Sequence, residues 1–366
     1  MIKKLLKKIL NICNQIYKVR LRFDLPIKNK ILLFDETHSN TLREIVNKDF
    51  NILKVRSEKE VYFWILLRQV IIFDFKFVTY CENYIKFISP KIIITFIDTN
   101  IDFYKLKNKF NHIKFISVQN GLRTADWFQS KKMSVSKNLK CDHIFVFNKY
   151  IINKYKKHIN SNYHTLGNFK NNIIKVNKTK IHNQFLFISQ FNKTDKIFIN
   201  FQKKLLKYIN IYILYSNSKL HILLRSKNPS DQLEEMKFYK KIFQSNCIFL
   251  KSLKWKKAYK IIDNFENIIF MYSTLGFEAI ARKKKVAIFS PDKILGFKYY
   301  FGWPRPFQKR HEYFLGKKLT YSEIKRVLGN ISKCSQTHWQ KKYYSVIKDE
   351  MYLNQGNVKL EELYFN

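Results

Sequence analysis

Short runs of continuous apolar residues alternate with longer amphipathic stretches along most of this chain, and this alternation limits the folds that it can adopt. Residues 31–34, 144–147 and 268–271 each consist of four apolar residues. A strand that is apolar on both faces is buried on both sides, as in a parallel sheet covered by helices. Because parallel strands need crossover connections, which are usually helical, the alternation predicts an α/β fold.

The alternation occurs in two successive series. In the first we expect strands at residues 31–34, 51–55, 91–98, 113–118 and 144–148, with helices at 37–48, 58–88 (broken near 73–74) and 103–110. In the second we expect strands at 185–189, 221–225, 268–271 and 286–289, with helices at 196–209, 231–243, 255–263 and 275–282. A chain of 366 residues is also long for a single core. We therefore predict two tandem doubly wound, Rossmann-like domains with a cleft between them.

Changes in composition set the expected domain boundaries. A polar segment at residues 168–183 separates the two series, so the first domain is expected at 23–175 and the second at 176–340. Residues 1–22 precede the first strand as a separate basic segment, and residues 341–366 are expected to form a helical tail.

The first 22 residues combine lysines with apolar residues at helical spacing, such as Ile2, Leu5, Leu6 and Ile9. Charge interrupts this segment too often for a signal peptide. It is either a basic amphipathic helix lying on an anionic membrane leaflet or an ordinary surface helix packed on the first domain. No run in the sequence reaches the 18 or so apolar residues that a membrane span requires. The expectation is a cytoplasmic protein, peripheral on the inner membrane.

The formal net charge of +42 favours anionic partners. Only 11 of the 69 basic residues are Arg, and such a lysine excess is also what an A/T-biased genome produces. Nucleic acid is an alternative on charge alone, but the sequence has no zinc-finger spacing, RNP-type motif or Arg-rich arm. No dedicated nucleic-acid role is predicted. The five cysteines are scattered without a CxxC pair, which is typical of unpaired thiols in a reducing compartment.

The segment Ser273-Thr274-Leu275-Gly276-Phe277-Glu278 directly follows an expected strand and opens an expected helix. In open parallel sheets, ligands bind beyond the carboxyl ends of the strands. Free N–H groups and the helix dipole attract phosphate there, and Gly276 would allow close approach. The alternative is plain N-capping by Ser273 or Thr274, with Glu278 as a first-turn acid.

These residues also carry a family resemblance. Residues 273–290 resemble the donor-binding segment of GT-B glycosyltransferases. Over roughly residues 30 to 320 the chain resembles a bacterial family of O-antigen, or surface carbohydrate, biosynthesis proteins, and residues 115–121, 164–172, 187–191 and 300–304 also carry that likeness. The resemblance implies that Glu278 contacts the donor ribose and that the Ser273-Thr274 turn approaches its phosphates. A second Glu eight positions on is missing, since Val286 stands there, so a retaining mechanism is not supported.

Further candidate residues follow other expected strands. Arg225 suits bidentate binding of phosphate, and Ser189 and Gln190 are candidates for further phosphate contacts. In the first domain, Gln119, Asn120 and Gly121 either bind sugar hydroxyls or form a simple Asn-Gly turn. Asn168 lies at the domain junction, where it either lines the same cleft or belongs to a hinge with the preceding glycine.

An inverting transfer needs a general base near the acceptor hydroxyl. Asp35 is the first candidate, followed by Asp98 and Asp126; Glu36 and His38 stand beside Asp35. Each of these residues can equally be a helix cap or a turn residue. No metal site is expected, because the sequence has no Asp-x-Asp motif or ligand spacing.

The predicted function is an inverting, metal-independent glycosyltransferase. It would move a sugar from a nucleotide-sugar donor to a lipid-linked or growing glycan of the cell surface. No tightly bound cofactor is expected, since the nucleotide sugar is a co-substrate. Two alternatives stay open: a nucleotide-sugar epimerase of the same fold, and a non-catalytic scaffold of the polysaccharide assembly machinery.

Overall fold

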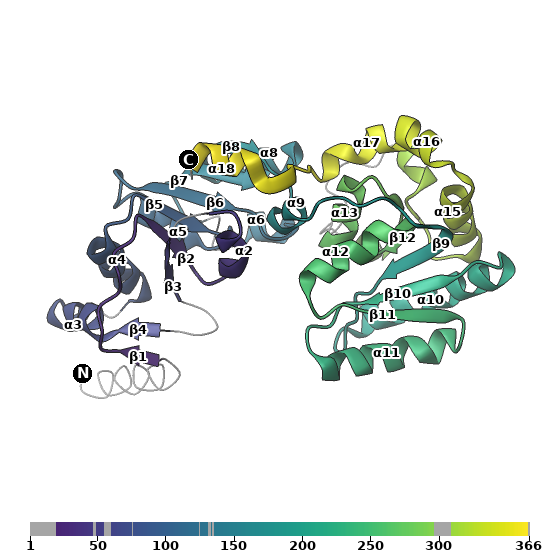
Figure 1. Ribbon diagram of the computed structural model, residues 1–366, viewed down its shortest axis with the longest axis horizontal. Helices are drawn as coiled ribbons and strands as arrows, with labels where there is room; N and C mark the ends of the chain where they lie inside the picture. The colour runs from purple at the N-terminus through teal and green to yellow at the C-terminus, as the bar shows by residue number, and fades with distance from the viewer. Residues whose placement is uncertain are drawn as a thin grey trace.

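The structure is a computed structural model that describes residues 20–295, except 47–48, 55–59, 75, 124, 131–132 and 134, and residues 309–364. Figure 1 shows two α/β domains side by side, joined by α9 (Phe169–Ile173) and by the yellow C-terminal segment. Both sheets are parallel, so the predicted fold class is confirmed. The expected N-terminal helix (residues 1–19 of it) and the 300–304 segment lie outside the described residues.

The N-terminal domain contains a six-stranded sheet with the order β3-β2-β5-β6-β7-β8. The strands are β2 (Ile31–Phe34), β3 (Asn51–Leu53), β5 (Ile92–Thr95), β6 (Lys114–Val118), β7 (Leu139–Val146) and β8 (Ile159–Thr165). The helices are α2 (Ser39–Arg43), α3 (Phe63–Ile71), α4 (Phe77–Ile88), α5 (Ile101–Lys107), α6 (Ala125–Gln129) and α8 (Lys149–Tyr155). A separate pair, β1 (Arg20–Arg22) with β4 (Glu60–Tyr62), lies beside α3 (Figure 1).

Strand residues of this sheet alternate between two apolar layers. Leu32 and Phe34 belong to the layer formed with α4 and α5, whereas Ile31 and Leu33 belong to the opposite layer. This two-sided burial is what the continuous apolar runs predict, because successive side chains of a strand point to opposite faces.

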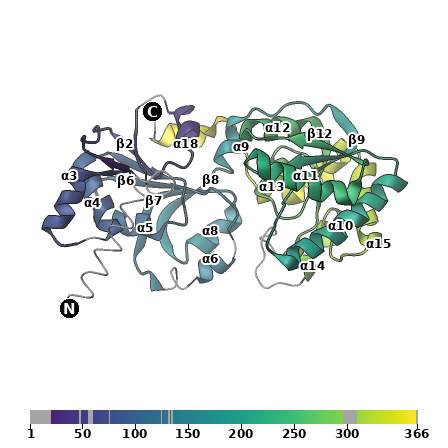
Figure 2. The same cartoon turned by 90° about the horizontal axis from the view of Figure 1, so that it is seen from below.

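The C-terminal domain has a five-stranded parallel sheet with the order β11-β10-β9-β12-β13. Its strands are β9 (Ile181–Ile188), β10 (Leu220–Leu224), β11 (Cys247–Lys251), β12 (Phe265–Phe270) and β13 (Lys285–Ile288). The covering helices are α10 (Lys196–Tyr215), α11 (Pro229–Phe243), α12 (Trp255–Asn264), α13 (Thr274–Ala281), α14 (Pro291–Leu295) and α15 (Tyr321–Lys333). Figure 2 shows these helices on both sides of the sheet.

Several element predictions need correction. The helix expected at 37–48 is the shorter α2, which begins after His38, a residue in the left-handed conformation (φ 64°), and ends at Arg43. Strands β8 and β11 were not predicted, since both carry polar or exposed residues that interrupt the apolar pattern. The long helical stretch expected at 58–88 is broken as predicted, because Phe73, at φ 52°, follows α3 and α4 begins at Phe77. Its first part is wrong, since residues 60–62 form strand β4.

The C-terminal segment is not a tail outside the domains. After α15 it passes through α16 (Gln336–His338), η2 (Trp339–Tyr344), α17 (Ser345–Ile347) and η3 (Lys348–Glu350), and it ends in η4 (Gln355–Asn357) and α18 (Val358–Tyr364). Leu360 of α18 is buried in the N-terminal domain together with Ile31 and Phe169. We call residues 350–357 the C-terminal strap, because they cross from one domain to the other (Figure 1).

The strap is held to the N-terminal domain through backbone and amide contacts. Gly167 forms an antiparallel bridge with Leu353, and a Cβ at Gly167 would lie 1.9 Å from the carbonyl oxygen of Tyr352. Asn172 donates to the Asn357 side chain at 2.8 Å and accepts from the backbone N–H of Asn354 at 3.1 Å. The chain therefore crosses between the domains twice, once after α9 and once in the strap.

No helix in the described part of the chain is long and apolar enough to cross a membrane.

Candidate functional site

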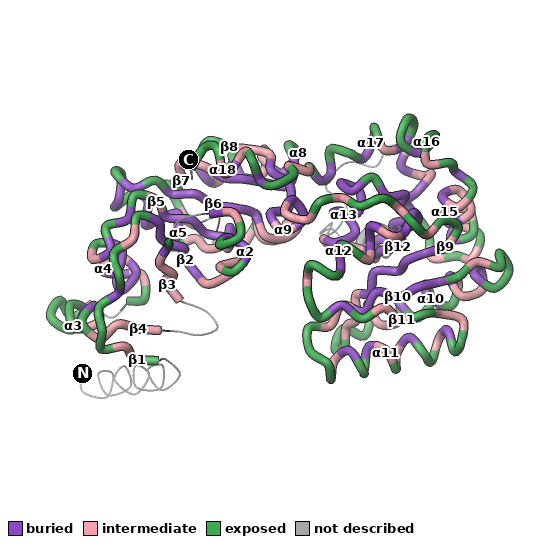
Figure 3. Tube along the Cα trace, viewed as in Figure 1, coloured by how far each residue is buried: buried purple, intermediate pink, exposed green. Residues whose placement is uncertain are grey.

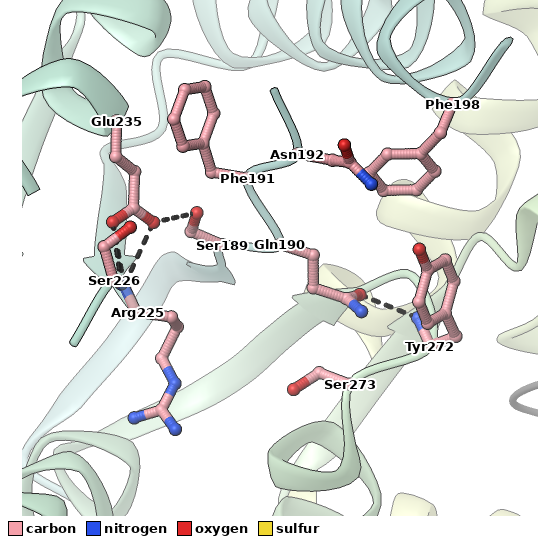
Figure 4. Close-up of a pocket in the computed structure, with 10 residues that line it drawn as sticks. All are labelled: Ser189, Gln190, Phe191, Asn192, Phe198, Arg225, Ser226, Glu235, Tyr272 and Ser273. Carbon is pink, nitrogen blue, oxygen red and sulfur yellow. Dashed lines mark hydrogen bonds between the residues drawn. The ribbon is translucent and has the colours of Figure 1, made fainter. Parts of the chain in front are cut away.

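Two adjoining cavities open at the carboxyl ends of β9, β10 and β12. The first, the cleft cavity, has a volume of about 460 Å³ and lies between the domains. It is lined by Asn120, Asn168 and Lys170 from the N-terminal domain and by Gln190, Arg225, Trp255, Ala258, Tyr259, Tyr272, Ser273, Thr274, Leu275 and Glu278 from the C-terminal domain. The second, the strand-end cavity, of about 360 Å³, shares Gln190, Arg225, Tyr272 and Ser273 with it (Figure 4).

The N-terminus of α13 faces both cavities. Strand β12 ends at Phe270, and Ser273 occupies the N-cap position in an extended conformation (φ −67°, ψ 132°). Its hydroxyl makes no capping hydrogen bond, so the predicted alternative of side-chain capping by Ser273 is not observed. The hydroxyl and the positive end of the helix are therefore available to an anion.

Glu278 lies one turn into α13, and its side chain is nearly buried, with 3% of the residue exposed. Burial raises the pKa of its carboxyl group, while a hydrogen bond from Tyr259 and the charges of Arg225, Lys170 and Arg282 oppose that rise. A carboxylate held in this way at the cavity wall can accept hydrogen bonds from ligand hydroxyls.

Gly276 has a different role from the one predicted. It is buried, and a Cβ there would lie 2.2 Å from the ring of Phe270. The glycine is thus required by the packing of α13 on β12. It does not supply close approach of phosphate to the backbone, because its missing side chain faces the core.

Arg225 follows β10 and borders both cavities, with its guanidinium group pointing away from Glu235 (Figure 4). The loop that carries it is held by Glu235, a fully buried carboxylate on α11. Glu235 accepts hydrogen bonds from the backbone N–H groups of Arg225 (3.0 Å) and Ser226 (2.9 Å). The Glu235 carboxylate therefore fixes the position of the Arg225 backbone. Glu235 was not among the residues predicted from the sequence.

Ser189 and Gln190 both take part in the wall, but indirectly. The Ser189 hydroxyl donates to Glu235 and lies 2.8 Å from the hydroxyl of Tyr239. The Gln190 Oε1 accepts from the backbone N–H of Tyr272 at 2.8 Å, which ties the β9 loop to the β12 loop (Figure 4). The Nε2 group of Gln190 is the part of this pair that remains for a ligand.

The sequence pattern of a family described as "putative O-antigen biosynthesis protein" matches residues 116–365, more than half of the chain. The chain belongs to this family. The match covers the whole C-terminal domain and the strap, together with the last strands of the N-terminal domain. A search of curated proteins gives no match.

Solved structures show which proteins share the fold of this family member. MnaA of S. aureus, solved with UDP, has a TM-score of 0.50 at 14% identity, over 93% of this chain and 98% of that one. The UDP-GlcNAc 2-epimerase of Methanocaldococcus jannaschii has a TM-score of 0.51 at 14% identity, over 93% and 100%. The wall teichoic acid polymerase TagF has a TM-score of 0.50 at 11% identity, over 92% and 88%. At such identities the likeness shows the fold alone, which is the GT-B arrangement of two domains.

The Gln-Asn-Gly turn of the N-terminal domain contributes one lining residue, Asn120. Gln119 is buried and uses its amide to hold backbone: Oε1 accepts from Phe147 N–H at 2.9 Å, and Nε2 donates to Gly121 O at 2.8 Å. The prediction that Gln119 binds sugar is therefore not supported. Gly121 forms the turn and is not among the residues that line the two cavities.

Asn168 lines the cleft cavity and also caps α9, since its Oδ1 accepts from the backbone N–H of Lys170 at 2.9 Å. Of the two alternatives considered for the domain junction, the structure supports the one in which Asn168 lines the cleft. The glycine before it, Gly167, serves the strap, and Asn168 faces the cleft.

Of the three predicted bases, Asp98 is engaged elsewhere. Its carboxylate is fully buried in an ion pair with Arg123, and it also accepts from the Tyr155 hydroxyl and from the Asn120 N–H at 3.1 Å. These hydrogen bonds occupy both carboxylate oxygens of a fully buried side chain, so the structure argues against Asp98 as a general base. It positions the Asn120 backbone instead.

Asp35 is almost completely buried at the end of β2, where it accepts from the N–H (2.9 Å) and hydroxyl of Thr37. These contacts form the turn into α2 and account for its left-handed conformation at φ 87°. Asp126 lies in α6; its side chain is outside the described part of the structure.

Lys170 and Trp255, which were not predicted as ligand-binding residues, also line the cleft cavity. Lys170, on α9, lines the cleft cavity and places its ammonium group 5.6 Å from the ring centre of Trp255 on α12. Burial lowers the pKa of Lys170, whereas Glu278 acts to raise it. The signal that could have identified Lys170 is its position two residues after Asn168, on a helix that begins at the domain junction.

His38 stands just behind the N-terminal wall of the cleft. Its Nε2 forms a hydrogen bond with Oδ1 of Asn120, and its ring packs edge-on against Phe96 at 5.2 Å. Burial and the nearby charge of Lys170 lower the pKa of His38 to about 4. The ring is therefore neutral near pH 7, with one nitrogen able to accept a proton.

Among the described residues there is no group of three or more His, Cys, Asp or Glu side chains that could hold a metal ion.

Proposed function

We propose that this protein is a glycosyltransferase that binds a nucleotide-sugar donor in the cleft cavity and transfers the sugar to a surface polysaccharide acceptor. The observation that carries the proposal is the convergence of Arg225, the N-terminus of α13 and Glu278 on one cavity that the N-terminal domain also lines. The family, whose description is O-antigen biosynthesis, supports a glycan as the product.

The diphosphate and the ribose of the donor each have a matching group in this arrangement. Arg225 and the uncapped start of α13 supply positive charge and hydrogen-bond donors for the diphosphate. Glu278 supplies carboxylate oxygens for the two ribose hydroxyls. Lys170 adds a positive charge from the opposite wall, so the two domains would share the donor between them. None of these contacts needs a divalent cation, and we propose a metal-independent reaction.

The acceptor would enter from the N-terminal side, where our candidate base is His38, which is hydrogen-bonded to the lining residue Asn120. A neutral imidazole can take the proton from the acceptor hydroxyl as that oxygen attacks the anomeric carbon. The bond from this carbon to the donor phosphate then breaks, and the nucleoside diphosphate leaves with the electron pair. Arg225, Lys170 and the α13 dipole stabilise the charge on the leaving group. Attack from the face opposite the leaving group inverts the anomeric centre.

We place this activity at the cytoplasmic face of the inner membrane. The basic N-terminal segment and the net charge of +42 support attraction to anionic lipid, where a lipid-linked glycan acceptor would be found.

Donor binding is the direct test. The full chain is titrated calorimetrically with UDP-, GDP-, CMP- and dTDP-sugars, with Glu278→Gln as the variant that keeps the shape but removes the charge. We expect one donor class to bind, and Glu278→Gln to weaken it by about 1.5–3 kcal/mol, the usual worth of a charged hydrogen bond. Glu234→Gln is the matched control, because Glu234 is an exposed residue of α11 that lines neither cavity, and this variant should bind like the wild type.

The products of the bound donor separate transfer from its rivals. Release of nucleoside diphosphate only when a glycan acceptor is present supports transfer. Formation of an epimer without any acceptor would instead identify an epimerase, and assembly of glycan by cells carrying a variant that no longer binds donor would identify a scaffold. Absence of binding for all four donor classes contradicts the donor site itself.

A further inference from the structure

An apolar surface projects from the N-terminal domain at the end far from the C-terminal domain. Helix α3 buries Ile65 and Gln69 but exposes apolar side chains along its other face and in the turn after it. We call these residues the α3 wedge: Trp64, Leu67, Val70, Ile71, Ile72 and Phe73. Figure 3 shows α3 exposed at the edge of the molecule, beside β1 and β4.

The turn at the tip of the wedge, after α3, is held in a defined conformation by hydrogen bonds. Phe73 is 85% exposed although it is a large aromatic residue in the left-handed region, at φ 52°. The buried Gln69 holds this conformation, because its Nε2 donates to the carbonyl oxygens of Asp74 (3.0 Å) and Lys76 (2.9 Å). The buried Gln69 side chain therefore stabilises the turn in which Ile72 and Phe73 are exposed to solvent.

The segment that follows β1, which includes Phe23 and Ile27, extends the same apolar surface. The indole N–H of Trp64 donates to the carbonyl oxygen of Phe23 at 2.8 Å, and the rings of Phe23 and Phe63 lie 5.4 Å apart. Phe23 and Ile27 are 65% and 75% exposed. Strand β1, which begins at Arg20, pairs with β4 beside this surface.

Basic residues around the wedge indicate what kind of partner it binds. Arg68 and Lys76 are exposed on the wedge helix and beside its tip, and Arg20 lies on β1. Lys76 and Arg20 each lie 3.8 Å from a carboxylate, that of Asp74 and that of Glu60, whereas the Arg20 side chain is still 72% exposed. A second copy of this chain carries the same net charge of +42 over its whole length, which opposes self-association. An anionic bilayer satisfies both features, since its acyl region accepts apolar side chains and its headgroups attract cations.

We infer that the α3 wedge inserts into an anionic phospholipid bilayer, with Ile72 and Phe73 at its tip. This inference rests on the proposed membrane-linked function but needs no sugar nucleotide, so failure of the transferase proposal leaves it testable. It also places membrane contact on the folded N-terminal domain in addition to the N-terminal segment.

The test is co-sedimentation of the full chain with vesicles of phosphatidylglycerol and phosphatidylethanolamine. The wedge variant is Ile72→Ser with Phe73→Asn, because Asn is well tolerated in the left-handed region and the fold should keep its thermal stability. The matched control is Leu214→Ser with Tyr215→Asn on the C-terminal domain, where the two side chains are 56% and 84% exposed. A third protein lacks residues 1–19.

We expect the wedge variant to bind these vesicles at least about tenfold more weakly, since it lacks two of the apolar side chains that would be buried in the bilayer. The control variant should bind like the wild type. Equal binding of wild type and wedge variant overturns the inference, as does loss of all binding on removal of residues 1–19 while the wedge variant keeps it. A lipid-free dimer that the wedge variant dissociates also overturns it, because a second copy would then cover the surface.

Discussion

At the scale of single residues, the catalytic question turns on His38 and its two neighbours, Asn120 and Lys170. The hydrogen bond that His38 Nε2 donates to Asn120 Oδ1 orients the imidazole, and the charge of Lys170 helps to keep the ring unprotonated. Asp35 and Asp98, which the sequence favoured as bases, are instead occupied by a turn and by an ion pair. A residue that seemed a turn residue thus becomes the base candidate because of what surrounds it.

We predict that His38→Asn abolishes transfer without affecting the donor site. Asn fits the left-handed backbone at this position, so the fold should persist. Loss of a general base lowers the turnover rate by typically 10²–10⁴-fold, while the donor dissociation constant measured by calorimetry should stay within about twofold. His112→Asn, an exposed histidine of the same domain, serves as the control.

The pH profile of the wild type gives an independent check. Because the pKa of His38 is lowered to about 4, the neutral base persists below pH 6.5, and kcat/KM should fall only as the pH drops towards 4. A fall near pH 6.5 would contradict the buried base. If Asp35→Asn stops transfer and His38→Asn does not, the base is Asp35.

At the scale of elements, the C-terminal strap decides how the domains are held. Its contacts are mostly amide and backbone hydrogen bonds, from Asn148, Asn172 and Asn357, around the close approach at Gly167. At the other crossing, directly after α9, Arg282 donates to the carbonyl oxygens of Ile174 and Lys175. Arg282 also pairs with the buried Asp263. Both crossings are therefore anchored by polar groups whose partners are specific.

We predict that Gly167→Ala destabilises the protein by more than about 2 kcal/mol. A left-handed conformation (φ 80°) alone costs a residue with a Cβ about 1–2 kcal/mol, and the new methyl group would also displace the strap at Tyr352. Gly329→Ala is the control, because its Cβ meets nothing within 4 Å and the position lies in helix α15. Urea unfolding measures both free energies, and equal values for the two variants would show that the strap is not held at Gly167.

At the scale of the whole molecule, the excess of positive charge acts on the folded chain itself. The described ion pairs are mostly at the surface, and one of them, Lys256 with Glu44 at 2.7 Å, joins the two domains beside the cleft. Such exposed pairs contribute little. Unpaired like charges repel one another in the compact state, and salt screens this repulsion.

We therefore predict that the thermal midpoint of unfolding rises as NaCl increases from 0.05 to 0.5 M. A gain of 1 kcal/mol corresponds to roughly 2–4 °C for domains of this size. Chloride is used because sulfate and phosphate can occupy the donor site, and KCl should give the same rise if screening is the cause. A midpoint that falls with either salt would show that attractive ion pairs outweigh the repulsion.

The sequence by itself determined the two-domain α/β fold and the location of the site. Continuous apolar runs can be buried only between helices, and their repetition in two series required two parallel sheets. Since ligands bind at the carboxyl ends of such strands, the residues after them, including Arg225, Ser273 and Glu278, were identified from the chain alone and do line one cavity.

Only the tertiary structure decided which of these polar residues face a ligand and which serve the fold. Gly276 and Gln119 had the right positions in the sequence, but one packs on Phe270 and the other holds backbone. His38 meets Asn120 from 82 positions away, and Asn172 meets Asn357 from 185 positions away. Periodicity reports the burial of a residue within its own element, whereas such partners are set by the path of the chain through both domains.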